Sequence, residues 1–95
     1  MARKTQKLDL VMVDGDQCFW VNNGPALRNV KDLSDALKSM SEDSYSYHVN
    51  AEKNDFANWV LNALKDETLA SKLSKAKTLK SATKAVDDRL KKYNI

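Results

Sequence analysis

The spacing of the apolar residues changes near Asn29, and this change predicts an α+β fold. The N-terminal part holds three short runs of β-forming residues, at 8–13, 18–21 and 26–28. Asp14-Gly15 suits the positive φ angles of a tight turn, and Pro25 cannot continue a strand ladder. We therefore expect a small antiparallel β-sheet of two or three strands over residues 8–28, a β-meander in which the third run returns against the second.

From Asn29 onward the apolar residues recur every three or four positions, which is typical of amphipathic helices. The pattern predicts four or five short α-helices over residues 29–95, so the fold is helix-dominated. Their expected N-caps are Asn29, Ser41, Asn50 or Asn54, Asp66, and Thr78 or Ser81. In the central helix, expected over 51–64, Phe56, Trp59 and Val60 share the face that packs into the core.

Length and composition indicate one domain. The chain has 95 residues, of which 42% are hydrophobic and 31% charged, a composition that excludes a disordered tail or a fibre. We divide it into a basic N-terminal arm, 1–7, and a single compact domain, 8–95. The apolar run after the arm is too short for a signal peptide or a membrane span, and one cysteine cannot form an internal disulfide. A cytoplasmic protein without a membrane partner is expected.

The net charge of +3 is distributed unevenly along the chain. Residues 71–95 carry seven lysines and one arginine against two aspartates, so this segment has a net charge of +6 and residues 1–70 have −3. An anionic partner is therefore expected to bind the C-terminal segment.

The basic residues of this segment are the main candidates for a binding site. They are Lys77, Lys80, Lys84, Arg89, Lys91 and Lys92, joined by Arg3, Lys4 and Lys7 of the arm. In the last helix Lys80, Lys84 and Lys91 lie opposite an apolar stripe, so this helix can pack and present a basic ridge together. The ridge either neutralises phosphates or is a solvated helix face, in which Lys84 pairs with Asp88 and Asp87 with Lys91.

Two aromatic residues have different expected roles. Trp59 lies on the apolar stripe of the central helix and is expected in the core. Trp20 alternates with Phe19 and Val21 on a strand, so it is either exposed and able to bind a partner, or covered.

Candidate catalytic groups are few. His48 is either a general base oriented by Asp55 or a structural histidine bonded to a helix terminus, and the absence of an accompanying nucleophile or glycine-rich loop favours the structural role. Cys18 is read as a small strand residue and not as a nucleophile. Neither metal-ligand spacing nor a phosphate-cradling loop is present, so no metal or cofactor is expected.

The string Tyr47-His48-Val49-Asn50, followed by Lys53-Asn54-Asp55-Phe56 and Trp59-Val60, resembles the YHVNxxKNDFxxWV signature of a small domain of unknown function from archaeal and bacterial proteins. The resemblance covers about residues 18 to 92 and implies a defined domain without assigning it an activity.

From the residues we expect a non-catalytic interaction module that docks onto a larger assembly, protein or nucleoprotein, through the basic C-terminal helix and the arm. The alternative is a protein that binds nucleic acid directly and largely without sequence preference. A third hypothesis is an enzyme that uses His48 and Asp55. It is disfavoured because the sequence offers no other catalytic groups that would converge on these two residues.

Overall fold

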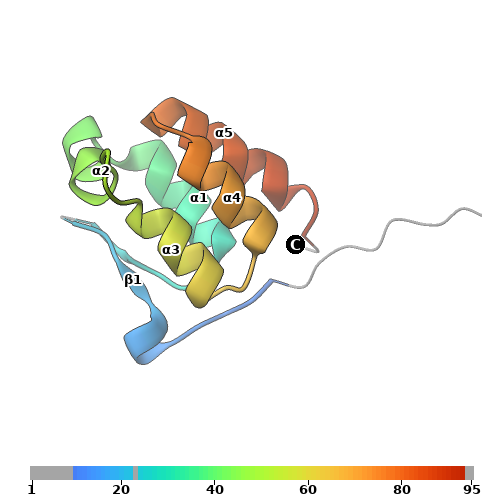
Figure 1. The fold of residues 1–95 in the computed structure, drawn as a ribbon. Helices are drawn as coiled ribbons and strands as arrows, with labels where there is room; N and C mark the ends of the chain where they lie inside the picture. Colours follow the sequence, from blue (N-terminus) through green and yellow to red (C-terminus); the bar gives the residue numbers. More distant parts are fainter. Residues whose placement is uncertain (1–9, 23, 94–95) are drawn as a thin grey trace, which may run out of the picture.

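In the computed structural model of the chain, the described residues form five short α-helices packed with a two-stranded antiparallel sheet (Figure 1). The structure describes residues 10–22 and 24–93. The elements are a 3-10 turn (Gly15–Gln17), β1 (Phe19–Trp20), β2 (Ala26–Leu27), α1 (Val30–Ser39), α2 (Glu42–His48), α3 (Asp55–Asn62), α4 (Glu67–Lys75) and α5 (Leu79–Leu90). This arrangement confirms the expected helix-dominated α+β class.

The sheet is smaller than the predicted meander. β2 returns against β1 as expected, with Phe19 opposite Leu27 and Trp20 opposite Ala26. Residues 10–13 form no strand, so the prediction of a strand over 8–13 is wrong for these residues. Residues 8–9 lie outside the described part.

The reason lies in the turn that follows. Gly15 adopts the expected positive φ, +57°, but it begins a 3-10 turn and no hairpin. Residues 10–13 are therefore not folded back onto β1. The backbone N–H of Val13 donates to the Arg28 carbonyl oxygen at 2.9 Å, and this bond is not continued into a ladder within the described residues.

Each α-helix begins at a polar residue whose side-chain oxygen accepts the backbone N–H three positions later. These N-caps are Asn29, Ser41, Asn54, Asp66 and Thr78. The structure selects Asn54 over Asn50 for the central helix, so that helix does not begin at 51. The side chain of Asn50 instead accepts the N–H groups of Glu52 and Lys53 in the preceding turn. Ser81 completes a capping box with Thr78.

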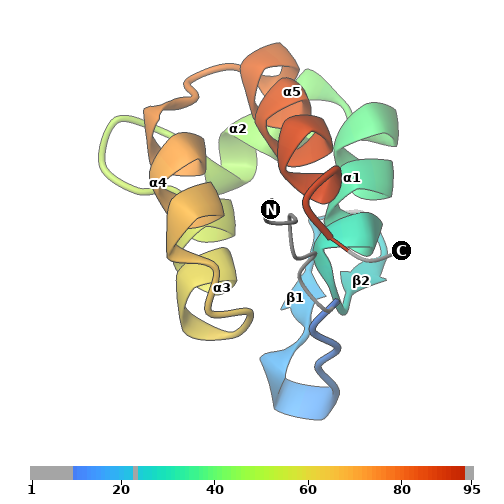
Figure 2. The ribbon, with the colours of Figure 1, turned by 90° about the vertical axis from the view of Figure 1, so that its right-hand side faces the viewer.

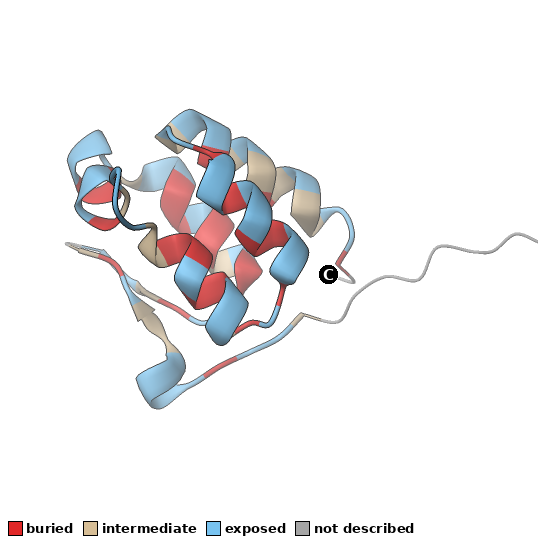
Figure 3. Ribbon diagram, viewed as in Figure 1, coloured by how far each residue is buried: buried red, intermediate tan, exposed pale blue. Residues whose placement is uncertain are grey.

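The helices form two packed pairs, α3 with α4 and α1 with α5, and α4 also contacts α5 (Figure 2). The buried faces of the helices point toward one another, and their exposed faces point outward (Figure 3). Phe56, Trp59 and Val60 are buried as predicted. Phe19 joins the sheet to this core, because its ring stacks on Phe56 with the centroids 4.8 Å apart.

A buried carboxylate fastens the end of α5 to the connection between α3 and α4. Asp66 Oδ2 accepts hydrogen bonds from Arg89 Nε at 2.9 Å and from the Tyr93 hydroxyl at 2.5 Å. Its Oδ1 accepts the N–H of Leu69 at the start of α4. Burial by itself would raise the pKa of Asp66, but these hydrogen bonds outweigh it and hold the pKa below its ordinary value. Burial and the bond to Asp66 raise the pKa of Tyr93.

The lowered pKa of Asp66 predicts a specific loss of stability in acid. A carboxylate whose pKa is depressed by folding stabilises the protein above its unfolded pKa, and this contribution disappears as the pH falls through the folded pKa. We expect Asp66→Asn to lower the free energy of unfolding by about 2 kcal/mol at neutral pH, because Arg89 loses its charged partner. Urea unfolding at neutral pH and in acid below the lowered pKa of Asp66 measures this effect.

The difference between wild type and the Asn variant should shrink in acid, where both carry a neutral group at position 66. Glu52→Gln, which removes an exposed charge, is the control and should change stability by less than about 0.5 kcal/mol. A difference between wild type and Asp66→Asn that stays constant across this pH range would contradict the role given to the carboxylate.

Candidate functional site

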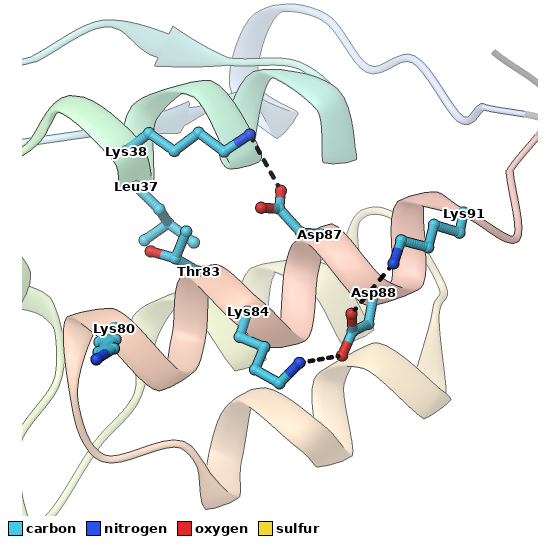
Figure 4. A pocket seen from close by; sticks show the side chains of 8 residues that line it. All are labelled: Leu37, Lys38, Lys80, Thr83, Lys84, Asp87, Asp88 and Lys91. Atoms are coloured by element: carbon cyan, nitrogen blue, oxygen red, sulfur yellow. Dashed lines mark ion pairs between the residues drawn. The ribbon is translucent and has the colours of Figure 1, made fainter.

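A groove of about 770 Å³ runs between α1 and α5. Figure 4 shows the side chains that line it: Leu37, Lys38, Lys80, Thr83, Lys84, Asp87, Asp88 and Lys91. Steps of four, seven and eleven residues place Lys84, Asp87 and Lys91 on the same helix face as Lys80. The sequence predicts these three lysines on one side of α5, but it does not identify Lys38, because no local pattern shows that α1 packs beside α5.

Asp87 links the two helices across the groove. Its Oδ1 accepts a hydrogen bond from Ser34 Oγ at 2.8 Å and lies 3.3 Å from Lys38 Nζ (Figure 4). The hydrogen bond from Ser34 is the largest cause of a lowered pKa of Asp87. Burial opposes it, and the ammonium of Lys38 lowers the pKa further. The sequence predicts an i, i+4 pair of Asp87 with Lys91. The structure adds an ion pair with Lys38 of another helix, and the charge of Lys91 also lowers the pKa of Asp87.

Asp88 neutralises part of the basic ridge. Its carboxylate lies 3.4 Å from Lys84 Nζ, which confirms the expected i, i+4 pair, and 3.8 Å from Lys91 Nζ. Lys80 is different, because it makes no ion pair within the part of the chain that the structure describes. The groove thus combines paired lysines along one rim with one lysine whose ammonium is available at the start of α5, and Leu37 beneath it is almost fully buried.

A second basic feature adjoins the groove, and we call it the lysine elbow. It consists of the exposed residues Lys72, Lys75, Lys77, Lys80 and Lys84, which run from the end of α4 through the connection into α5. Residues 71–86 contain no Asp or Glu. The positive charge of this segment is therefore not offset by its own sequence, unlike that of the groove rim.

The remaining predicted binding residues divide into three groups. Lys91 and Lys92 are exposed on the C-terminal side of α5. Arg89 points inward to Asp66, and its side chain is only 19% exposed, so it is committed to the fold and does not contribute to the basic surface. Arg3, Lys4 and Lys7 of the arm lie outside the described residues.

His48 is buried and both of its ring nitrogens have partners. The backbone N–H of Asn22 donates to Nε2 at 3.0 Å, and Nδ1 lies 3.0 Å from Asp55 Oδ2. Because Nε2 accepts a hydrogen bond, the neutral ring carries its proton on Nδ1 and donates it to Asp55. Its ring also contacts Phe19 and Phe56 edge to face. The predicted Asp55 contact is present, and the ring joins α2 to the end of β1 and the start of α3.

Trp20 and Cys18 lie on or beside β1. The Trp20 side chain is on the outer face of the strand and 69% of the residue is exposed, in agreement with the exposed alternative. Cys18 is half-buried, and its thiol points to the Val13 carbonyl oxygen at 3.9 Å. Trp59 is in the core, where its indole N–H donates to the Gln17 carbonyl oxygen at 2.7 Å.

In residues 10–22 and 24–93, no three His, Cys, Asp or Glu side chains lie close enough together to hold a metal ion. None of the helices formed by these residues has both the length and the apolar character needed to cross a bilayer.

Comparison with known proteins identifies one family. The model of a family of unknown function (DUF5752) matches residues 17–88, which include both strands, α1 to α4 and most of α5. No curated protein and no solved structure matches the chain.

The contacts of His48 predict a structural contribution. We expect His48→Ala to lower the free energy of unfolding by about 3 kcal/mol, because two hydrogen bonds and two buried ring contacts are lost. Tyr47→Ala removes the exposed ring whose centroid lies 5.0 Å from that of His48 but leaves both hydrogen bonds of His48 intact, so it should cost less than about 1 kcal/mol. Chemical denaturation followed by circular dichroism compares the two variants.

Nitrogen NMR of the ring provides a second readout, since it distinguishes the two neutral tautomers. The proton should be on Nδ1. A proton on Nε2, or a stable His48→Ala variant, would contradict the structural role.

Proposed function

This chain belongs to DUF5752, a family of unknown function, and we propose that it is a non-catalytic interaction module that docks onto an acidic protein within a larger assembly. The docking site is the groove between α1 and α5, with the lysine elbow beside it and the basic N-terminal arm adding charge. The observation that carries the proposal is the lysine-lined groove between these two helices.

The mixture of charges in the groove favours a protein partner over a phosphate backbone. Asp87 and Asp88 stand on the same rim as Lys84 and Lys91, so a continuous row of phosphates would meet two carboxylates. A helix with separate acidic and aliphatic side chains avoids this conflict. Its carboxylates can pair with Lys80 and with the exposed ammonium of Lys84, while its aliphatic side chains pack along the methylene stems of these lysines.

The hydrogen bonds of His48 and Asp55, the two residues that resemble a catalytic pair, support a non-catalytic function. His48 has both nitrogens engaged by Asn22 and Asp55, so the ring would have to break a native hydrogen bond before Nε2 could accept a substrate proton. Most polar groups of the groove are lysines and carboxylates in ion pairs, and Lys80 has no ion pair among the described residues, an arrangement suited to recognition.

Direct binding of nucleic acid is the second candidate, and the lysine elbow supports it. Five exposed lysines follow one another there without an acidic residue among them, which is the arrangement that a polyanion requires.

Charge reversal tests the docking proposal. We expect Lys80→Glu combined with Lys84→Glu to abolish recovery of the partner when the protein is used as bait in a lysate of its own host, because the partner's carboxylates would face carboxylates. The recovered partners are identified by mass spectrometry, and their affinity for the purified bait is then measured by calorimetry. Wild-type affinity should fall as salt is raised.

The matched control is Lys31→Glu combined with Lys65→Glu, which makes the same change of charge on exposed residues outside the groove. This control should retain the partner. Equal recovery by both double variants would rule out the groove as the docking site.

The nucleic-acid candidate predicts a steep dependence of affinity on salt. If five lysines neutralise phosphates, a fourfold rise in salt should weaken binding by a factor on the order of several hundred. Fluorescence anisotropy with single-stranded and duplex probes, DNA and RNA, measures this at low and moderate salt. Absence of binding to every probe at low salt would eliminate this candidate and leave the docking proposal unaffected.

A further inference from the structure

The end of β1 lies against α2 and is held there through both backbone groups of Asn22 (Figure 1). The Asn22 N–H donates to His48 Nε2 at 3.0 Å, and the Asn22 carbonyl oxygen accepts a hydrogen bond from Ser44 Oγ at 3.1 Å. A strand of two residues in a two-stranded sheet has little stability of its own. These contacts with α2 therefore fix the end of β1, and one of them is made by a titratable nitrogen.

The bond from Asn22 to His48 is possible in only one protonation state of the ring. Nε2 accepts the Asn22 N–H through its lone pair, which requires the neutral ring with its proton on Nδ1. A proton from solvent that adds to Nε2 turns this nitrogen into a donor. Two N–H groups then face each other where a donor faced an acceptor, so Asn22 and His48 must move apart.

The opposite side of the ring keeps its partner in both states. Nδ1 carries a proton in the neutral ring and in the imidazolium, so it donates to Asp55 Oδ2, 3.0 Å away, in either state. Two further titratable groups stand beside this pair. Lys53 Nζ lies 3.2 Å from the same carboxylate oxygen, and the ring centroid of Tyr47 lies 5.0 Å from that of His48. Protonation therefore breaks the contact with β1 and keeps the contact with α3.

Asn22 is the side of this contact that can move. The His48 ring is packed edge to face against Phe19 and Phe56, with centroid distances of 4.8 and 5.2 Å, and is bonded to Asp55. Asn22 instead borders a cavity of about 310 Å³, which residues of α1 and α2 also line. The backbone at Asn22 thus has free space beside it into which it can shift.

We propose that His48 is a pH-sensitive latch: its neutral ring holds the end of β1 on α2, and its protonated ring releases it. The bond from Ser44 to the Asn22 carbonyl oxygen limits the release to a local opening. Histidine is the side chain whose charge ordinarily changes between about pH 5 and 8, so mild acidification is the signal that operates the latch. No residue that lines the basic groove belongs to β1 or α2, so the latch does not depend on the docking proposal.

Amide hydrogen exchange, followed by NMR between about pH 8 and pH 5, tests the latch. After correction for the intrinsic exchange rate, protection of the Asn22 amide should fall about tenfold, because one hydrogen bond is lost. The midpoint of this fall should coincide with the titration of the His48 ring. The Val21 amide donates to the Pro25 carbonyl oxygen, which does not titrate, and should keep its protection. Asp66 stays charged throughout this range, since its pKa is below the ordinary value.

His48→Gln separates the contact from the titration, because a glutamine amide oxygen can accept the Asn22 N–H and does not titrate. The Asn22 amide of this variant should stay protected across the whole pH range. Tyr47→Phe, which removes only the hydroxyl of the neighbouring exposed ring, is the matched control and should behave like wild type. The comparison of Asn22 with Val21 in wild type needs no variant, so it holds even where the glutamine variant folds poorly.

Four results would each overturn the latch. They are an Asn22 amide that stays protected while the ring is charged, a ring that remains neutral until the protein unfolds, an equal loss of protection at Asn22 and Val21, and a folded His48→Gln variant that still loses protection in acid.

Discussion

The helices of this protein are too short to be stable alone, and the rest of the structure depends on how they are held together. Within the described residues the longest, α5, has 12 residues and α2 has 7. Isolated helices of this length are marginal in water, because the cost of nucleation is recovered over few hydrogen bonds. Stability therefore comes from two sources: a capping side chain at the start of every α-helix, and tertiary contacts that join helices distant in sequence. Asp66 combines both, since it caps α4 and binds Arg89 and Tyr93 at the end of α5.

The need for tertiary contacts also explains why the residues that resemble an active site have structural roles. A two-residue strand cannot hold itself against a helical layer, so β1 is fixed through Phe19 in the aromatic core and through Asn22 bonded to His48. Buried polar groups stabilise a fold only when they are fully satisfied. In the described part of the chain no buried side-chain nitrogen or oxygen lacks a partner. The polar groups available for recognition consequently lie on the outside, along α5 and the lysine elbow.

In the docking proposal, the groove acts through charge. Its long-range attraction is screened by salt and is shaped by the carboxylates of Asp87 and Asp88, which pair with lysines of the same groove.

The sequence by itself determined the helices and most of their beginnings, because periodicity and capping are local properties of a few consecutive residues. It also placed Phe56, Trp59 and Val60 in the core. It could not decide whether residues 10–13 form a strand, because a strand exists only through a partner, and the turn at Gly15 carries this segment away from β1. Nor could the sequence show that Arg89 points inward while its basic neighbours are exposed, or that Lys38 lies beside α5. Those roles depend on Asp66 and Asp87, which only the packing of the helices brings within reach.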